Sequence, residues 1–159
     1  MNSYYSHRMT MAGLDITRMS TEDLQSIVDK LFRGKIHGIS FSPYVAGQGP
    51  GTILTEDQIR ERLAIVEPYV NWIRTFSCTE GNEIIPEIAH EHGLKTMVGV
   101  WLGEDLDKNE EELAGAIRVA HAGHADILGV GNEVLLRGDL TEEQLVEYLE
   151  RAKIGRAHV

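Results

Sequence analysis

The sequence predicts an α/β fold, the N-terminal half of a (β/α)8 TIM barrel with about four strand–helix units and parallel strands. One observation is the alternation of apolar, strand-like segments with amphipathic helical segments along the 159 residues. Another is the spacing of the strand centres Ile39, Ile73, Val98 and Leu128, which follow each other at intervals of 34, 25 and 30 residues. The strands are also nearly continuous apolar runs, such as MVGVWL and ILGVG, as expected when both faces are covered. A doubly wound open sheet fits these observations equally well.

Four strands are predicted from these apolar runs. They comprise residues 36–42, 72–77, 95–102 and 127–132. Parallel neighbours require a crossover connection of a dozen or more residues, usually helical, and each interval between the runs contains one helical segment. The strands therefore belong to repeated strand–helix units with short loops.

The helices are predicted from capping residues and from apolar residues at helical spacing. They are expected to open at Ser20 or Thr21, Thr55, Asn82, Asn109 and Thr141. Three expected capping-box partners are Gln58, Glu112 and Gln144. Glycines that are expected to end helices are Gly34, Gly93 and Gly123. The last two helices are expected to bury Leu113, Ile117, Ala120, Leu145, Tyr148, Leu149 and Ala152.

The chain divides into three predicted parts. Residues 1–35 form an N-terminal leader and helix, and residues 36–153 form the half-barrel. The last six residues, 154–159, resemble the translation of a common sequencing adapter, so we expect the native sequence to be interrupted near Lys153. The chain contains no secretory signal and no apolar run of membrane-spanning length. We expect a soluble protein that is cytoplasmic, or periplasmic or secreted if an upstream signal was lost.

Charge and composition exclude several classes of function. Asp and Glu number 25 against 15 Lys and Arg, giving a formal charge of -10, which repels nucleic acid and anionic membranes. The single Cys78 cannot form an internal disulfide, and we expect it to be a packing residue. The histidines do not make the HExxH pattern of a zinc site. We therefore expect no nucleic-acid partner and no metal.

Polar and aromatic residues gather where the predicted strands end. These residues are Tyr44, Arg74, Trp101, Asn132 and Glu133. In a (β/α)8 barrel the chemistry lies at the carboxyl ends of the strands, whereas nucleotide sites in open sheets carry glycine-rich turns before a helix. The glycine stretch GQGPG is neither GxGxxG nor a Walker sequence, so we expect a flexible loop there. The strand ends therefore favour the barrel over the open sheet.

Four segments together resemble bacterial glycoside hydrolase family 17. They are GISFSPY, WIRTFS, LKTMVGVWLG and VGNEVLLRGDLT, and the resemblance covers residues 36–153 in order. The most specific is GNEV at the end of the fourth strand, because Asn followed by the acid/base Glu is the signature of the clan that contains this family. The resemblance implies a cofactor-free enzyme that acts on β-1,3-glucan with retention, by hydrolysis or by transglycosylation.

The resemblance also implies a role for each strand-end residue. Glu133 would be the general acid/base, with a pKa held high while the sugar bond is intact. Asn132 would hydrogen-bond the 2-hydroxyl of the sugar at the cleavage point. Arg74 would hold a carboxylate ionised, since an arginine in an apolar strand needs an acidic partner. Tyr44 and Trp101 would line the sugar cleft, with core packing as the other interpretation of both.

A retaining mechanism also needs a nucleophilic carboxylate about 5–5.5 Å from the acid/base. In the family that this chain resembles, it lies on the seventh strand, in a C-terminal half that this sequence does not contain. We therefore expect the 159-residue chain to be an inactive fragment of a glycosidase. Two alternatives stay open: a non-catalytic carbohydrate-binding barrel, and a barrel lyase or isomerase acting on sugar phosphates.

Overall fold

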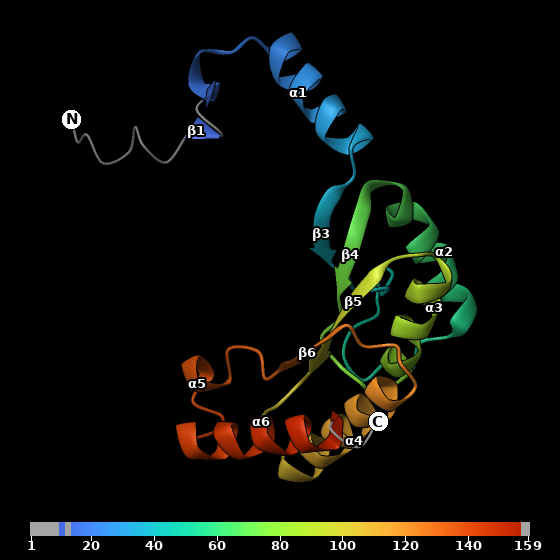
Figure 1. Cartoon of the computed structure of the whole chain (residues 1–159), viewed down its shortest axis with the longest axis vertical. Coiled ribbons are helices and arrows are strands. Elements are labelled where there is room, and N and C mark those ends of the chain that lie inside the picture. The colour runs from blue at the N-terminus through green and yellow to red at the C-terminus, as the bar shows by residue number, and fades with distance from the viewer. Residues whose placement is uncertain (1–9, 12–13, 157–159) are drawn as a thin grey trace, which may run out of the picture. The chain divides into compact units, whose positions relative to one another are not determined.

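The structure, a computed structural model, describes residues 10–11 and 14–156 and divides the chain into two units, Met1–Ile36 and His37–Val159 (Figure 1). Of the tail expected at 154–159, residues 154–156 continue the last helix, and the other three lie outside the described residues. Most of the expected leader, residues 1–9 and 12–13, also lies outside them. Among the described residues, no helix is both long and apolar enough to span a bilayer.

The described residues of the first unit form a two-stranded ribbon and one α-helix. Strands β1 (Thr10–Met11) and β2 (Leu14–Asp15) pair antiparallel, a short 3-10 turn (Ile16–Arg18) follows, and helix α1 spans Thr21–Arg33. The expected cap at Ser20 is confirmed as a full capping box, in which the Ser20 hydroxyl accepts a hydrogen bond from the amide of Asp23 at 3.1 Å. Gly34 caps the other end, as expected.

The second unit is built on a four-stranded parallel sheet (Figure 1). Its strands are β3 (Ile36–Ser40), β4 (Val70–Arg74), β5 (Lys95–Val100) and β6 (Ile127–Val130), and they lie side by side in sequence order. Arg74 lies opposite Met97 in the β4–β5 pairing, and Val100 lies opposite Val130 in the β5–β6 pairing. The predicted alternation of parallel strands and helices is confirmed, and the sheet is consistent with part of a barrel.

Every strand ends two or three residues earlier than predicted. The ladder continues for one residue past β4 and β6, where the amide of Thr75 donates to Met97 at 3.0 Å and that of Gly131 donates to Val100 at 3.0 Å. The chain then leaves the sheet, although the sequence stays apolar. Apolar residues beyond a strand end can be buried without belonging to the strand; Leu102, for example, is completely buried. Apolar runs therefore overestimate strand length at this edge.

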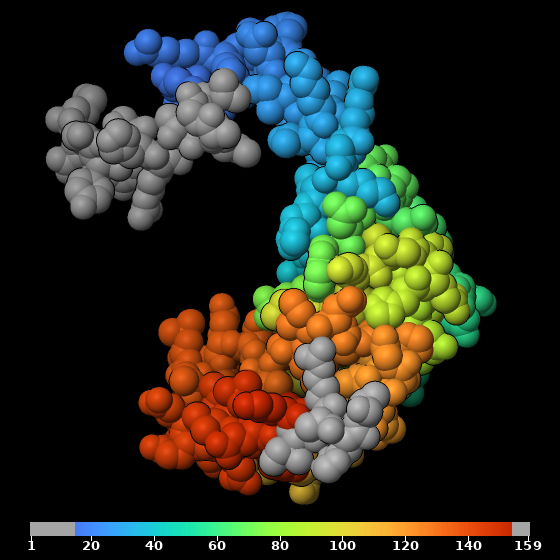
Figure 2. All heavy atoms as spheres, in the orientation of Figure 1, coloured from blue at the N-terminus to red at the C-terminus, as the bar shows by residue number. Residues whose placement is uncertain are grey.

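Helices connect the strands and cover the sheet. They are α2 (Glu56–Val66), α3 (Ile85–Glu91), α4 (Leu106–His121), α5 (Val134–Arg137) and α6 (Glu142–Arg156). Helices α3 and α4 both contact β5, α2 packs on α3, and α6 contacts α4 and β6. Figure 1 shows α2 and α3 on one side of the sheet, and Figure 2 shows α6, drawn in red, at the surface.

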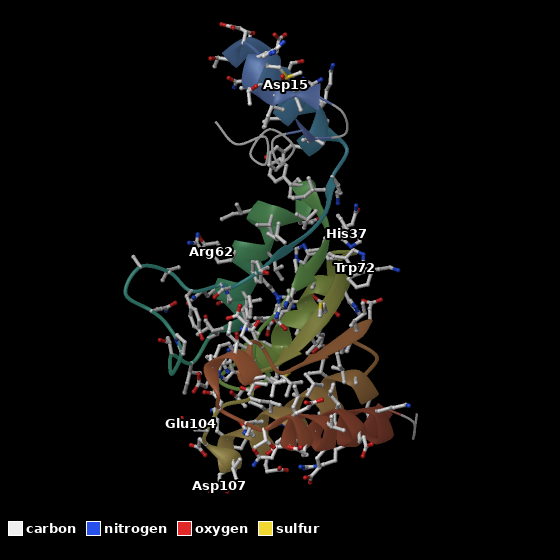
Figure 3. All side chains as sticks on the ribbon, turned by 90° about the vertical axis from the view of Figure 1, so that its left-hand side faces the viewer. Asp15, His37, Arg62, Trp72, Glu104 and Asp107 are labelled. Carbon is white, nitrogen blue, oxygen red and sulfur yellow. The ribbon has the colours of Figure 1, made fainter. Side chains whose placement is uncertain are left out.

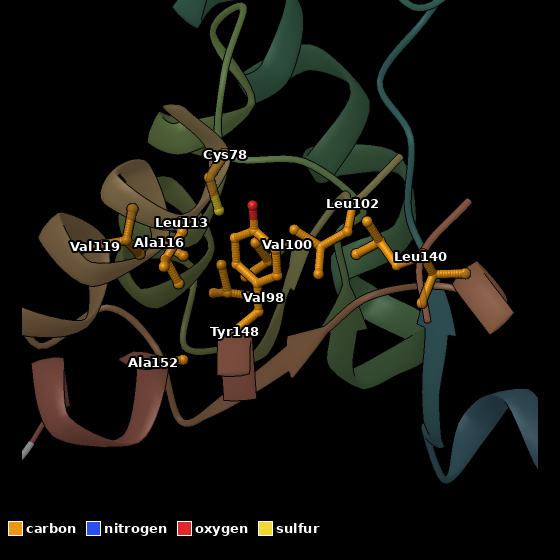
Figure 4. Packing of buried hydrophobic residues seen from close by; sticks show 11 residues of the cluster. Cys78, Val98, Val100, Leu102, Leu113, Ala116, Val119, Leu140, Tyr148 and Ala152 are labelled. Carbon is orange, nitrogen blue, oxygen red and sulfur yellow. The ribbon is translucent and has the colours of Figure 1, made fainter. Parts of the chain in front are cut away.

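The main core lies between β5, α4 and α6. Val98 and Val100 from β5 meet Leu113 and Ala116 from α4 and Tyr148 from α6 (Figure 4). Cys78 joins this cluster, and its thiol donates a hydrogen bond to the carbonyl of Gly99 at 3.3 Å. Burial raises the pKa of the Cys78 thiol far above its usual value, so the thiolate is not accessible near neutral pH. The interpretation of Cys78 as a packing residue is confirmed.

The expected start of the fourth helix was wrong. Helix α4 begins at Leu106, with Asp105 as the N-cap, which accepts a hydrogen bond from the amide of Lys108 at 3.1 Å. The predicted cap pair, Asn109 and Glu112, lies inside the helix and is buried. Asn109 instead bonds the amide and the carbonyl of Gly103, each at 2.8 Å. Asn109 and Glu112 therefore resemble a cap pair in the sequence, but in the structure both side chains bind the backbone of neighbouring loops.

Three smaller expectations also differ. Thr55 caps α2 and accepts a hydrogen bond from the backbone amide of Gln58. The side chain of Gln58 does not return to Thr55 to complete a capping box, because its NH2 group donates to the carbonyl of Pro43 at 2.8 Å. Thr141 and Gln144 do form the expected reciprocal cap of α6. Leu149 of α6 is 44% exposed, while Tyr148 and Ala152 are buried as expected. In α4 the buried apolar side chains are Leu113, Ala116 and Val119, so Ile117 and Ala120 lie at the edge of the buried face.

At the amino end of β5 a polar network joins two loops. Asp126 accepts hydrogen bonds from the amide of Thr96 at 2.8 Å and pairs with His90 at 3.0 Å. The hydroxyl of Thr96 donates to the carbonyl of His124 at 2.7 Å. Partial burial acts to raise the pKa of Asp126, but the hydrogen bonds from Thr96 and His90 outweigh it and hold that pKa below its usual value. His90 and His124 therefore belong to a network that connects the loops at this end of the sheet.

One face of the sheet carries an accessible groove of about 270 Å³. His37, Ile39, Trp72, Met97 and Ile127 are among the residues that line it. The rings of His37 and Trp72 stack with centroids 5.9 Å apart, and Figure 3 shows the two side chains beside each other. Gly38 lies against Trp72, where an added Cβ would come within 2.7 Å of the tryptophan Cβ. Glycine is therefore required for the close approach of β3 and β4.

Candidate functional site

All five predicted site residues lie at the carboxyl ends of the strands. Arg74 is the last residue of β4, Trp101 directly follows β5, and Asn132 and Glu133 follow β6 after Gly131. Tyr44 lies four residues beyond β3. Since the strands are parallel and lie in sequence order, all four ends meet at one edge of the sheet. At this edge the structure forms two groups of residues.

The first group lines a cavity of about 610 Å³ at the ends of β3, β4 and β5. Tyr44 and Trp101 both line it, together with Phe41 and Phe76. Trp101 is 39% exposed, so its ring is available to a ligand. The polar lining includes Glu80, Lys108 and Glu112. An apolar, aromatic cavity with a few polar groups is typical of a small-molecule or carbohydrate site.

A glycine-containing loop borders this cavity and is fixed by side chains. Gly47 and Gly51 adopt left-handed backbone conformations, with φ of 85° and 91°. The amide of Gly51 donates to the carboxylate of Glu80 at 2.9 Å, and Lys108 approaches the same carboxylate at 3.4 Å. The side chain of Gln58 bonds Gln48 within the loop. The loop is thus anchored at several points, in contrast to the flexible loop expected from its glycines.

Glu112 is a residue of this site that the sequence reasoning misread. It is 2% exposed and accepts four hydrogen bonds, from the hydroxyls of Ser77 (2.5 Å) and Thr79 (2.7 Å) and from the amides of Cys78 (2.7 Å) and Trp101 (3.3 Å). A buried carboxylate is tolerated only when it is paired in this way. Its position next to Leu113 on the buried face of α4 was the signal for this role. Glu112 holds the loop after β4 and the backbone of Trp101 in place.

The second group pairs Arg74 with Asn132. The guanidinium Nη2 of Arg74 donates to Oδ1 of Asn132 at 2.7 Å, and its Cζ lies 5.0 Å from the ring centre of Phe76. The Nε–H of Arg74 is buried and has no hydrogen-bond partner among the described residues. We expected an acidic partner for this arginine, and within the described part of the chain it is an amide that receives the contact. A free buried N–H can still donate a hydrogen bond to a carboxylate from elsewhere.

Glu133 has an unusual backbone conformation. It stands at the N-terminus of the four-residue helix α5 with φ of 55° and ψ of 18°, and its side chain is exposed to solvent. Glycines at 131 and 138, both with positive φ, lie on either side. A non-glycine residue in the left-handed region is uncommon and is concentrated at functional sites. The exposed Glu133 side chain lies at the carboxyl edge of the sheet, directly after Asn132 in the sequence.

The groups at this edge are suited to proton transfer and to hydrogen bonding with hydroxyl groups. Among the described residues, no group of three or more His, Cys, Asp or Glu side chains could hold a metal ion. Aromatic rings, an amide–guanidinium pair and an exposed carboxyl group lie at neighbouring strand ends. A carboxyl group can exchange a proton with a leaving or attacking oxygen, and aromatic rings pack against sugar C–H groups.

The chain is similar to known glycoside hydrolases. Residues 38–157 match the family described as BtgE/BtgC glycoside hydrolase domain. A Schizosaccharomyces pombe protein named "Glucan 1,3-beta-glucosidase" is 28% identical over 103 residues, 61% of this chain and 32% of that protein. Proteins named "Probable beta-glucosidase btgE" from Aspergillus flavus and Aspergillus oryzae are each 25% identical over 123 residues, 76% of this chain and 20% of theirs. The chain therefore spans a third or less of the length of these curated relatives. No solved structure matches it.

Proposed function

Because the chain belongs to the BtgE/BtgC glycoside hydrolase domain family, we propose that it forms part of a retaining glycosidase or transglycosylase that acts on β-1,3-linked glucan. The observation that carries the proposal is the Arg74–Asn132 hydrogen bond, which fixes Asn132 and with it the exposed Glu133 at the carboxyl edge of the sheet. The name of the S. pombe relative supports β-1,3-glucan as the substrate class. The finer assignments, to glycoside hydrolase family 17 and to half of a TIM barrel, form part of this proposal.

In the proposed reaction Glu133 protonates the departing glycosidic oxygen and then removes a proton from water or from a sugar hydroxyl. Its outward position at the start of α5 suits a group that must reach the bond between two sugars. Asn132 uses its amide oxygen to accept from Arg74, so its NH2 group is the one directed to a sugar hydroxyl. A hydrogen bond to the 2-hydroxyl would strengthen as positive charge develops on the sugar.

Arg74 has the second task of stabilising the nucleophilic carboxylate. Its buried Nε–H, unpaired among the described residues, is a donor that such a carboxylate can use. We propose that the nucleophile comes from sequence outside this chain, since the chain covers 32% or less of its curated relatives. The 159-residue chain would then bind glucan without hydrolysing it.

The aromatic cavity is the proposed glucan-binding part of the site. Tyr44 and Trp101 supply ring faces for sugar C–H groups, and Glu80 and Lys108 supply polar groups for hydroxyls. Membership of a glycoside hydrolase family argues against the alternative of a lyase or isomerase acting on sugar phosphates.

The experiment is a titration of the chain with linear gluco-oligosaccharides of β-1,3, β-1,4 and α-1,4 linkage, followed by tryptophan fluorescence. The chain has two tryptophans, so Trp72→Phe leaves Trp101 as the single reporter. We expect a saturable change with the β-1,3 oligosaccharide in this background. Trp101→Ala should weaken binding by about tenfold or more, because buried apolar surface contributes about 25 cal/mol per Å², so losing roughly 60 Å² of covered ring surface costs about 1.5 kcal/mol. Isothermal calorimetry measures the affinity of the alanine variant.

Trp72 serves as the matched control because it lies in the groove on the sheet face and not in the aromatic cavity. Trp72→Phe should leave the affinity for the β-1,3 oligosaccharide unchanged. The proposal is wrong if no oligosaccharide binds, or if Trp101→Ala binds as well as the unaltered chain.

A further inference from the structure

We propose that Arg137 is a positioning residue that fixes the turn carrying Asn132 and Glu133. This inference deepens the proposed function and rests on it for the catalytic meaning of Glu133. In the sequence, Arg137 lies in the RGD tripeptide of the segment VGNEVLLRGDLT, which suggested no role for it. The contacts of its guanidinium group in the structure supply one.

All three nitrogens of the Arg137 guanidinium are engaged. Nη1 donates to the backbone carbonyl of Asn132, and Nη2 donates to the backbone carbonyl of Leu102 at 2.8 Å. Nε donates to the carboxylate of Asp139 at 2.7 Å, which also neutralises the charge through an ion pair with Nη2 at 2.6 Å. Arg137 thus ties the chain after β6 to the chain after β5. The planar guanidinium allows three such directed contacts, which a lysine ammonium cannot reproduce in the same geometry.

The turn needs such a contact because its own conformation is unfavourable. Glu133 has a positive φ of 55°, an unfavourable backbone conformation for a residue other than glycine. Helix α5 has four residues, too few to be stable by itself. Three backbone hydrogen bonds close the turn, from Arg137 to Glu133 at 2.9 Å, from Gly138 to Leu135 at 3.2 Å and from Asp139 to Val134 at 3.1 Å. The side-chain contacts of Arg137 to the neighbouring strand end supply the remaining restraint.

Arg137 also links the turn to the aromatic cavity. Its guanidinium carbon lies 4.6 Å from the ring centre of Trp101, which lines that cavity. One side chain therefore contacts both the proposed sugar-binding ring and the backbone of the Asn132–Glu133 turn. Its removal should affect oligosaccharide binding at Trp101 and the order of the turn together.

The test compares Arg137→Met, Arg137→Lys and Arg137→Ala by amide hydrogen exchange in the 159-residue chain. Arg118→Met, at an exposed position in the last turn of α4, is the matched control. In Arg137→Met the backbone amides of residue 137 and of Asp139 should exchange about tenfold faster, because the turn loses the charge-assisted hydrogen bonds that hold it to the neighbouring strand end. The exchange of Val98 in the core should not change. Arg137→Lys should give an intermediate rate.

Chemical rescue separates positioning from a general loss of stability. Adding guanidinium ion to Arg137→Ala should slow amide exchange in the turn again and restore the affinity of the variant for the β-1,3 oligosaccharide. If the substitution only destabilises the fold, guanidinium ion should destabilise the variant further. Equal turn exchange in Arg137→Met and the unaltered chain overturns the inference, and so does acceleration that extends to Val98. If the unaltered chain binds no oligosaccharide, the proposed function fails, and turn exchange with its rescue still decides the role of Arg137.

Discussion

Arg74 and Asn132 are 58 positions apart in the sequence, yet their side chains form a 2.7 Å hydrogen bond. This proximity is predictable, because the carboxyl ends of parallel strands meet at one edge of the sheet. The partner of Arg74 was not predictable, since an arginine can pair with either an amide or an acid. The role of Glu112 was missed for a different reason: a capping pattern and a buried anchor look alike in sequence, and only the position of the helix start distinguishes them.

At the residue scale, Glu112 provides the first test of stability. Its Oε1 accepts from the two hydroxyls and its Oε2 from the two amides. Glu112→Gln can direct its NH2 to the hydroxyls, which can turn to accept, so we expect a loss of about 1 kcal/mol. Glu112→Leu leaves two buried amides unpaired and should cost about 3 kcal/mol or more. Urea unfolding measures both values.

The neighbouring Glu111 is the control for this comparison because its side chain is 67% exposed on the same helix. Glu111→Gln and Glu111→Leu should stay within about 0.5 kcal/mol of the unaltered chain. Equal losses for Gln and Leu at position 112 would show that the hydrogen-bond arrangement described for Glu112 is incorrect.

At the element scale, helix ends were more predictable than strand ends. Helices carry local signals, such as Ser20 before α1 and Thr141 before α6, because the first amides of a helix need side-chain acceptors. A strand ends at the point where it diverges from the neighbouring strand, and no local sequence signal marks that point. The start of α4 was misplaced by one turn because Asp105 and Asn109 are both suitable caps.

Gly115 tests the packing of α4. Inside a helix, Gly→Ala normally stabilises by about 1 kcal/mol. Here an added Cβ would press against the carbonyl oxygen of Cys78 and lie 3.0 Å from its Cβ, so the backbone must move. We expect Gly115→Ala to destabilise the chain by about 1 kcal/mol or more, measured as a lower unfolding temperature. Gly49→Ala, with open space around the new methyl group, is the control, and the account is wrong if both variants behave alike.

The loop between α4 and β6 gives a pH-dependent test. The pKa of Asp126 is lowered in the folded chain. The ionised carboxylate therefore stabilises the fold at pH values above the pKa of Asp in the unfolded chain, which is about 3.9. That stabilisation is lost as the pH falls through the lower, folded value. Asp126→Asn should therefore be less stable at pH 7 by about 1–2 kcal/mol, and the difference should shrink toward pH 3. Urea unfolding at both pH values measures this difference, with the exposed Glu61→Gln as the control. A difference in unfolding free energy that is the same at pH 7 and pH 3 would contradict the prediction.

At the scale of the whole molecule, the sequence predicted a parallel sheet in sequence order with helices between the strands, and the second unit has this arrangement. Its regular spacing made the arrangement predictable, because each interval accommodates one crossover helix. The cavity was only partly predictable. Tyr44 and Trp101 were placed at strand ends, but the shape of the cavity depends on how Glu80 and Glu112 fix the surrounding loops. Such contacts join distant segments and leave no local pattern.

The central claim is that the carboxyl edge of the sheet is a glucan-binding site built around Glu133. The most direct test is a chemical-shift map of the chain titrated with a β-1,3 gluco-oligosaccharide. We predict that the largest shifts occur at Tyr44, Trp101, Asn132 and Glu133, with little change at Thr96 at the opposite end of the sheet. Shifts concentrated around Thr96, or no shifts at any concentration, would contradict the account.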